Sequence, residues 1–146
     1  MNIKKIRISL IFYQCYYTGE DEEIILFSSK EFLSQPLKVF VAVNTHDLKI
    51  AFEKSFKKND IIFIVGPKYK VINKTLKEFD KKNLFINFHF KNNCDKNIYF
   101  VITNECTIFF LPENPENLKS IINFNIIPFL KKYSAMLTQK TISQKT

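Results

Sequence analysis

Two short runs of uninterrupted apolar residues, many of them β-branched, limit the folds open to this chain. They are KVFVAV at residues 38–43 and IIFIV at residues 61–65, and such runs are typical of strands covered on both faces of a sheet. Between them Leu48 and Phe52 recur at helical spacing, and Asp47 can cap that helix. We therefore predict two adjacent, parallel central strands joined by a crossover helix.

The rest of the chain also alternates between strand and helix patterns. Apolar and other side chains alternate in residues 6–12 and again in residues 84–90, which predicts a first strand and a later extended segment. Helices are expected within residues 29–34 and 72–79, whereas the acidic residues 20–23 are expected in a loop. Strands that alternate with helices favour a three-layer α/β domain, in which helices cover both faces of a mainly parallel sheet.

The segment of residues 97–133 combines a predicted hairpin with the start of a helix. Residues 98–102 and 107–111 are apolar strands on either side of a turn, so the expected sheet is mixed. Asn114 can cap the following helix, and Pro115 suits its first position, where a missing N–H costs nothing.

The length of 146 residues suits one domain with a sizeable core. Pro128 is expected to break or kink the last helix, and the polar residues after 134 are expected to fray. We therefore divide the chain into a single domain of residues 1–134 and a polar tail of residues 135–146.

The net charge of +8 could favour nucleic acid or an anionic membrane surface, but a solvated lysine-rich surface is the preferred explanation. The sequence carries no aromatic and basic signature of an RNA-binding sheet, so no specific nucleic acid is expected. Nonspecific nucleic-acid binding stays an alternative, and a steep salt dependence would reveal it.

The three cysteines, Cys15, Cys94 and Cys106, are widely spaced and form no CxxC pair, and His46 and His89 lie at no recognisable metal spacing. Thiols in a reducing compartment and no metal site are therefore expected. No segment reaches the roughly 20 apolar residues of a membrane span, and the N-terminus lacks a signal-peptide pattern. We expect a cytoplasmic protein that does not enter a membrane.

Ligands of such sheets bind beyond the carboxyl ends of the strands, which directs attention to three loops. These are residues 17–23, 66–71 and 112–117. The last two precede predicted helices, whose first N–H groups are unpaired and can face an anion.

In order and spacing, these loops resemble the three signature regions of the molybdopterin-binding-like (MoaB/Mog-type) domain of the competence/damage-inducible protein (CinA) family. Gly19 retains the glycine of the first region, and Glu20 would stand for its acidic residue. Gly66 and Pro67 match the Gly-Pro of the second, glycine-rich region. Pro112 matches the Leu-Pro turn of the third region.

Other positions depart from the family pattern. The family's paired Asp has no counterpart, because Lys70 and the three residues after it occupy the available positions. Glu113 replaces a turn glycine, and Asn117 replaces a Glu. Asp60 would match the Asp that begins the family's second strand. The resemblance covers residues 6–133 and does not extend to the family's C-terminal deamidase domain.

The resemblance implies binding of molybdopterin or a nucleotide, or metal-dependent ADP-ribose pyrophosphatase activity. The paired Asp that could hold a cation is replaced, whereas Lys68 and Lys70 could attract a phosphate directly. We therefore expect a degenerate domain that binds a phosphate-bearing nucleotide or pterin, or serves as an interaction domain, without catalysis. The alternative is a pyrophosphatase with Glu20, Asp21 and Glu113 as substitute carboxylates.

The resemblance also implies a homo-oligomer and a small phosphorylated molecule as the partner. The ligand should bind where residues 66–71 face residues 112–117. The expected ligand-binding residues are Gly19, Glu20, Gly66, Pro67, Lys68, Lys70, Pro112, Glu113, Asn114 and Asn117.

Overall fold

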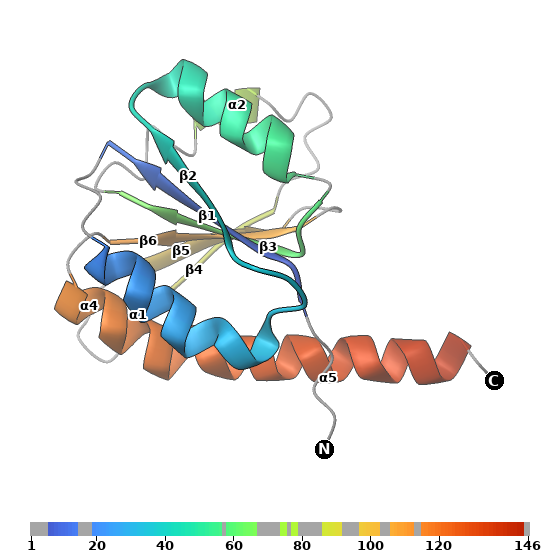
Figure 1. Ribbon diagram of the computed structural model, residues 1–146. Helices are drawn as coiled ribbons and strands as arrows, with labels where there is room; N and C mark the ends of the chain where they lie inside the picture. Colours follow the sequence, from blue (N-terminus) through green and yellow to red (C-terminus); the bar gives the residue numbers. More distant parts are fainter. Residues whose placement is uncertain are drawn as a thin grey trace.

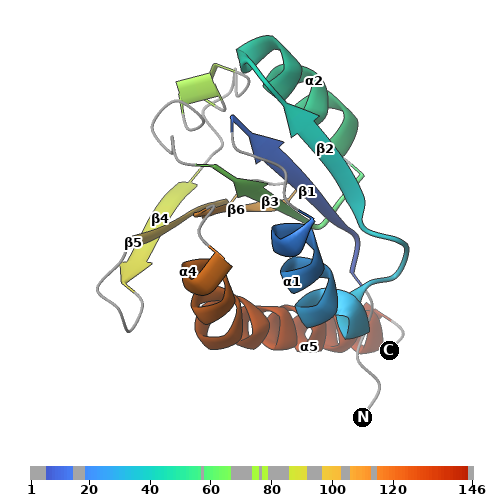
Figure 2. The same ribbon diagram turned by 60° about the vertical axis from the view of Figure 1, so that its left-hand side comes forward.

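A central sheet lies between two helical layers (Figure 1). The computed structural model describes residues 6–14, 19–56, 58–66, 74–75, 77–78, 86–91, 97–102, 106–112 and 115–144, with side chains described for these except at 86–98, 115, 117 and 137–144. One face is covered by α2 (Thr45–Ser55), and the other by α1 (Glu20–Ser29), α4 (Pro115–Ile121) and α5 (Ile127–Gln144) (Figures 1 and 2). The expected three-layer α/β fold is confirmed.

The described residues form a sheet of six strands in the order β2-β1-β3-β6-β5-β4. These strands are β1 (Ile8–Tyr13), β2 (Lys38–Ala42), β3 (Ile61–Val65), β4 (Ile86–Lys91), β5 (Asn97–Ile102) and β6 (Thr107–Leu111). Strands β2, β1, β3 and β6 run parallel to one another, whereas β5 is antiparallel to both β6 and β4. The expected mixed sheet and its late hairpin are confirmed.

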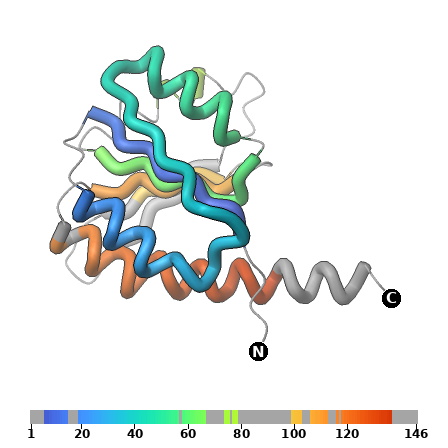
Figure 3. Tube along the Cα trace, viewed as in Figure 1, coloured from blue at the N-terminus to red at the C-terminus, as the bar shows by residue number. Residues whose placement is uncertain are grey.

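The first apolar run does not occupy the central position that we expected. Strand β1 lies between β2 and β3, so β2 is an edge strand and is not adjacent to β3 (Figure 3). Val41 on β2 is 56% exposed, whereas every residue of β1 is buried, Ser9 included. The prediction was wrong because Ser9 made β1 look half-exposed, although its other residues from Ile8 to Tyr13 are all apolar.

Phe109 on β6 joins the sheet to the layer of α1, α4 and α5. Its ring centroid lies 5.9 Å from that of Phe63, 5.4 Å from that of Phe100 and 4.9 Å from that of Phe129. The edge-to-face contact with Phe129 is a preferred aromatic geometry. A second buried cluster, on the opposite face of the sheet, packs Leu48 and other α2 residues against β1, β3 and β6.

The acidic residues expected in a loop begin α1. Four acidic side chains occupy its first turn, where they suit the positive end of the helix dipole. Asp21, Ile25 and Ser29 are buried at four-residue spacing, and the Ser29 hydroxyl donates a hydrogen bond to the Ile25 carbonyl at 2.6 Å. The helix expected within residues 29–34 is a short 3₁₀ turn, Lys30–Phe32, that continues α1.

Asn44, rather than Asp47, is the N-cap of α2. The Asn44 side-chain oxygen accepts a hydrogen bond from the Asp47 N–H at 2.9 Å, and the Asp47 carboxylate accepts one from the Val43 N–H at 3.2 Å. This reciprocal pair satisfies two backbone donors where the chain leaves β2.

The C-terminal helix passes its proline without a break. A π-helix, η2 (Ile122–Ile126), lies between α4 and α5, and the Ile127 N–H donates to the Ile122 carbonyl. Pro128 lacks an N–H and would crowd the carbonyl of Phe124 in a regular α-helix, and the wider turn accommodates it. Helix α5 then runs to Gln144, across the boundary expected at residue 134, and the fraying of the tail stays a prediction.

Other expectations fall on shorter described segments. The alternating pattern of residues 84–90 corresponds to β4, and the helix expected within residues 72–79 is described at four helical positions. In the described part of the chain, no helix has the length and apolarity required to cross a bilayer.

Replacing Phe109 with Ala should reduce the free energy of unfolding by about 3–5 kcal/mol, because it leaves a cavity among three packed rings. The matched control is Phe124→Ala, at a side chain that is 61% exposed, and it should change stability by less than about 0.5 kcal/mol. Urea denaturation measures both values, and equal losses would contradict this placement of the core.

Candidate functional site

The carboxyl ends of β1, β3 and β6 meet at one edge of the sheet. Phe12 pairs with Val65, and Val65 pairs with Leu111. Beyond these pairs, the Gly66 N–H donates a hydrogen bond to the Leu111 carbonyl at 3.1 Å. The loops that follow β3 and β6 therefore begin side by side, with Pro112 next along the chain.

Gly66 is fixed by the close approach of β1. A Cβ atom at this position would lie 2.5 Å from the Tyr13 carbonyl oxygen, a backbone atom that cannot turn away. Gly66 has no positive φ, so lack of space rather than backbone conformation requires the glycine. Gln14, the residue that follows β1, has a φ of 50°, and its backbone N–H donates a hydrogen bond to the Ala42 carbonyl at 3.0 Å.

The start of α1 is acidic rather than anion-binding in character. Glu20 and Glu23 are exposed, whereas the Asp21 side chain is buried, with 2% of its surface exposed. These carboxylates oppose the binding of a phosphate at this helix end and favour a cation. Gly19, just before them, has no atom within 4 Å of a Cβ placed there, so neither crowding nor a positive φ requires a glycine.

For four of the ten expected ligand residues the structure describes both the backbone and the burial. They are Gly19, Glu20, Gly66 and Pro112. The structure brings Gly66 and Pro112 together, whereas Glu20 lines a groove on the outer side of α1. Asn117 lies in α4, but its side chain is outside the described set. Outside the described residues lie Pro67, Lys68, Lys70, Glu113 and Asn114.

The list of expected ligand residues lacked Asp21, which is the buried carboxylate at this end of α1. A signal for it exists in the sequence, because Asp21, Ile25 and Ser29 repeat every four residues, as on the inner face of a helix. Among the described residues, no three His, Cys, Asp or Glu side chains are grouped closely enough to hold a metal ion.

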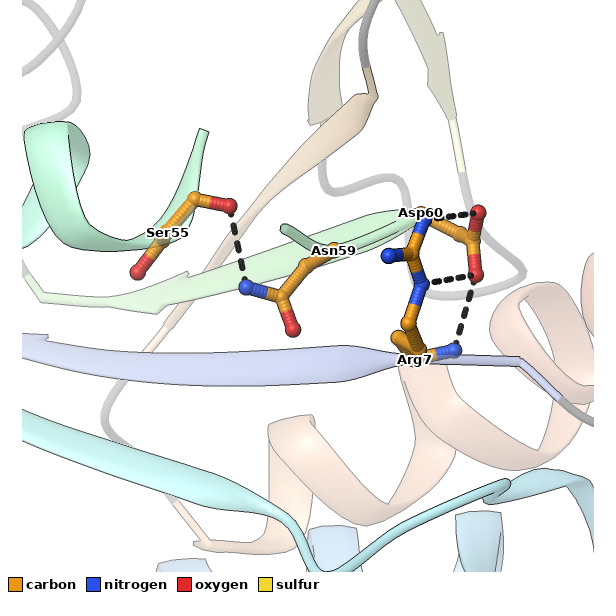
Figure 4. Close-up of polar contacts among 4 residues, drawn as sticks. All are labelled: Arg7, Ser55, Asn59 and Asp60. Carbon is orange, nitrogen blue, oxygen red and sulfur yellow. Dashed lines mark hydrogen bonds and ion pairs between the residues drawn. The ribbon is translucent and has the colours of Figure 1, made fainter. Parts of the chain in front are cut away.

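Asp60 lies at the opposite, amino-terminal edge of the sheet (Figure 4). Its carboxylate accepts a hydrogen bond from the Arg7 backbone N–H at 2.8 Å and forms an ion pair with the Arg7 guanidinium at 3.5 Å. The neighbouring Asn59 side chain donates to the Ser55 carbonyl at 2.9 Å (Figure 4). Asp60 therefore ties the start of β3 to the segment before β1, and it is remote from the carboxyl edge.

No family model matches the chain, and no curated protein matches it. Solved structures match it in fold. The crystal structure of molybdenum cofactor biosynthesis protein B is 14% identical, with a TM-score of 0.63, over 95% of this chain and 99% of that chain. The molybdopterin biosynthesis Mog protein from Mycobacterium ulcerans is 13% identical, with a TM-score of 0.53, over 85% of this chain and 98% of that chain. At these identities the similarity shows a MoaB/Mog-type fold alone.

Gly66→Ala should lower the free energy of unfolding by about 1–3 kcal/mol, because the added methyl group meets the Tyr13 carbonyl in a buried backbone contact. Gly19→Ala is the matched control and should cost at most about 1 kcal/mol, since it meets open space at a helix start. Thermal and urea unfolding compare the two. A Gly66→Ala variant as stable as the parent would show that the approach of β1 does not constrain this position.

Tyr133 on α5 should make stability fall in alkaline solution. Burial, followed by the nearby Asp60 carboxylate, raises the pKa of Tyr133 above its ordinary value of 10.0. The neutral phenol is thus favoured in the folded state, and its contribution is complete below pH 10.0 and is lost as pH rises through the folded-state pKa. The difference in unfolding free energy between the parent and Tyr133→Phe should therefore be constant below pH 10.0. At higher pH it should shift in favour of Tyr133→Phe. A difference independent of pH would contradict the raised pKa.

Proposed function

We propose that this chain is a degenerate molybdopterin-binding-type domain, similar to that of the CinA family, which binds a phosphate-bearing nucleotide or pterin without catalysis. The observation that carries the proposal is the position of Gly66, held against the Tyr13 carbonyl and hydrogen-bonded to Leu111. Because of these contacts, the loops after β3 and β6 begin next to each other. They do so at the carboxyl edge, where sheets of this type bind ligands.

The residues proposed to hold the ligand follow this common point in sequence. Lys68 and Lys70 come shortly after Gly66 and would supply positive charge to a phosphate. Asn114 and Asn117 would supply polar groups near the start of α4. Glu113 would repel a phosphate brought close to it, so we expect weak binding.

Catalysis is not part of the proposal because the carboxylates that a metal-dependent reaction needs are replaced. The family's paired Asp has no counterpart in residues 70–73, and Lys70 would repel a divalent cation there. A ligand held by lysines and backbone N–H groups would bind without added metal.

Binding should be detected as a rise in melting temperature with ADP-ribose, nucleotides or pterin phosphates, because a ligand that binds the folded state stabilises it. The rise should be independent of divalent metal and should shrink as salt is added. Replacing Lys68 and Lys70 together with Ala should weaken binding by about tenfold, whereas Glu113→Gly should strengthen it.

The matched control is the double replacement of Lys131 and Lys132 with Ala, which removes the same charge from exposed positions on α5. It should leave the affinity unchanged. If both lysine pairs lower the affinity equally, the effect is one of net charge, and the proposed site is wrong.

A metal-dependent ADP-ribose pyrophosphatase is the second candidate, and the buried Asp21 at the start of α1 favours it. The buried Asp21 carboxylate is a chemically suitable cation ligand. Metal-dependent hydrolysis of ADP-ribose that is abolished by Asp21→Asn or Glu113→Ala would establish this activity in place of simple binding.

A further inference from the structure

Helix α1 presents an apolar groove on the outer side of its layer. Phe27 is 86% exposed, more than any other large apolar side chain among the described residues. Beside it an open groove of about 870 Å³ is lined by residues of α1, α4, η2 and α5. Helix α1 lies alongside the continuous helix formed by α4, η2 and α5 (Figure 2). Its lining residues are Glu20, Glu23, Ile24, Leu26, Phe27, Ser28, Lys30, Lys119, Asn123 and Ile127.

The charges along this groove are separated toward the two ends of α1. Glu20 and Glu23 lie in the first turn, and Lys30 follows the last residue of the helix. Within the part of the chain that the structure describes, none of these side chains forms an ion pair. Lys119 of α4 also lines the groove, and it too has no ion pair there. An apolar centre with unpaired charges of opposite sign at its ends is suited to a partner of complementary charge.

The same surface on a second copy of this chain is complementary. Glu23 and Lys30 are equally distant in sequence from the midpoint between Leu26 and Phe27. When two α1 helices pair antiparallel about a two-fold axis at that midpoint, each Glu23 faces Lys30 of the other copy, and both contacts are formed by symmetry. Antiparallel packing also places the acidic end of each helix beside the basic end of its neighbour, which the helix dipoles favour.

We propose that α1 and its groove form a symmetric interface with a second copy of this chain. In this interface the Phe27 ring of each copy enters the groove of the other, and the pairs of Glu23 with Lys30 surround this apolar centre. An exposed aromatic residue in the middle of a patch, with charges at the rim, is the usual composition of an interface anchor.

Sedimentation equilibrium over a protein concentration series should show a monomer–dimer equilibrium for the parent chain. Glu23→Lys places like charges at both contacts, as does Lys30→Glu, and each should weaken dimerisation by about tenfold or more. Mixing these two variants in equal amounts restores opposite charges at both contacts, so a heterodimer of about parental affinity should form. The mixture distinguishes an interface from a local effect on α1, since each variant keeps its own helix unchanged on mixing.

Phe27→Ser should weaken dimerisation by about tenfold or more, whereas Phe124→Ser, at the exposed phenylalanine of η2, should leave it unchanged. Circular dichroism confirms that each variant is folded. A parent chain that stays monomeric, a mixture of the two charge variants that fails to associate, or equal effects of the two phenylalanine variants would each overturn the proposal.

Discussion

The pairing of β1 with β3 is the constraint on which the rest of the molecule depends. Every side chain of both strands is buried, so each face of the sheet must be covered before either strand is stable in water. Helix α2 covers one face, and the helices α1, α4 and α5 cover the other. The two strands lie so close beyond their last pair that Gly66 has no room for a side chain. This close approach of the two strands therefore leads directly into the edge that we propose for a ligand.

The sequence was sufficient to predict a strand or helix where the local pattern of residues agrees with the environment of that element in the fold. The run at residues 61–65 is apolar on both sides, and β3 is buried on both faces. The hairpin of β5 and β6 and the start of α4 at Pro115 also agree with expectation, since a turn and a proline act on the nearby backbone alone. The convergence of Gly66 with Pro112 follows from parallel strand order and was likewise predictable.

Other features depend on contacts between distant residues, which no local pattern contains. Val41 is as apolar as the residues of β3, yet β2 lies at the edge because β1 takes the place next to β3. The acidic start of α1 has a composition typical of a loop. Its helical conformation becomes predictable only once the burial of Asp21 and Ile25 is known, because that burial depends on tertiary contacts. The roles of Lys68 and Lys70 stay predictions, as does the proposed ligand.

The π-helix η2 also sets the rotational phase of the last helix. Leu118, Ile122, Ile126, Leu130 and Ser134 are all buried, at a constant spacing of four residues. In a regular α-helix each such step turns by about 40° too far, so the row would wind away from the sheet. The wider turn of η2 takes up one extra residue, about 100° of rotation, and brings the row back into line. A deletion of one residue between 122 and 126 would thus convert η2 into a regular α-helical turn and keep the inner face of α5 against the sheet. One residue added there would instead rotate that face by about 100°, so in this segment the number of residues matters as much as their chemistry.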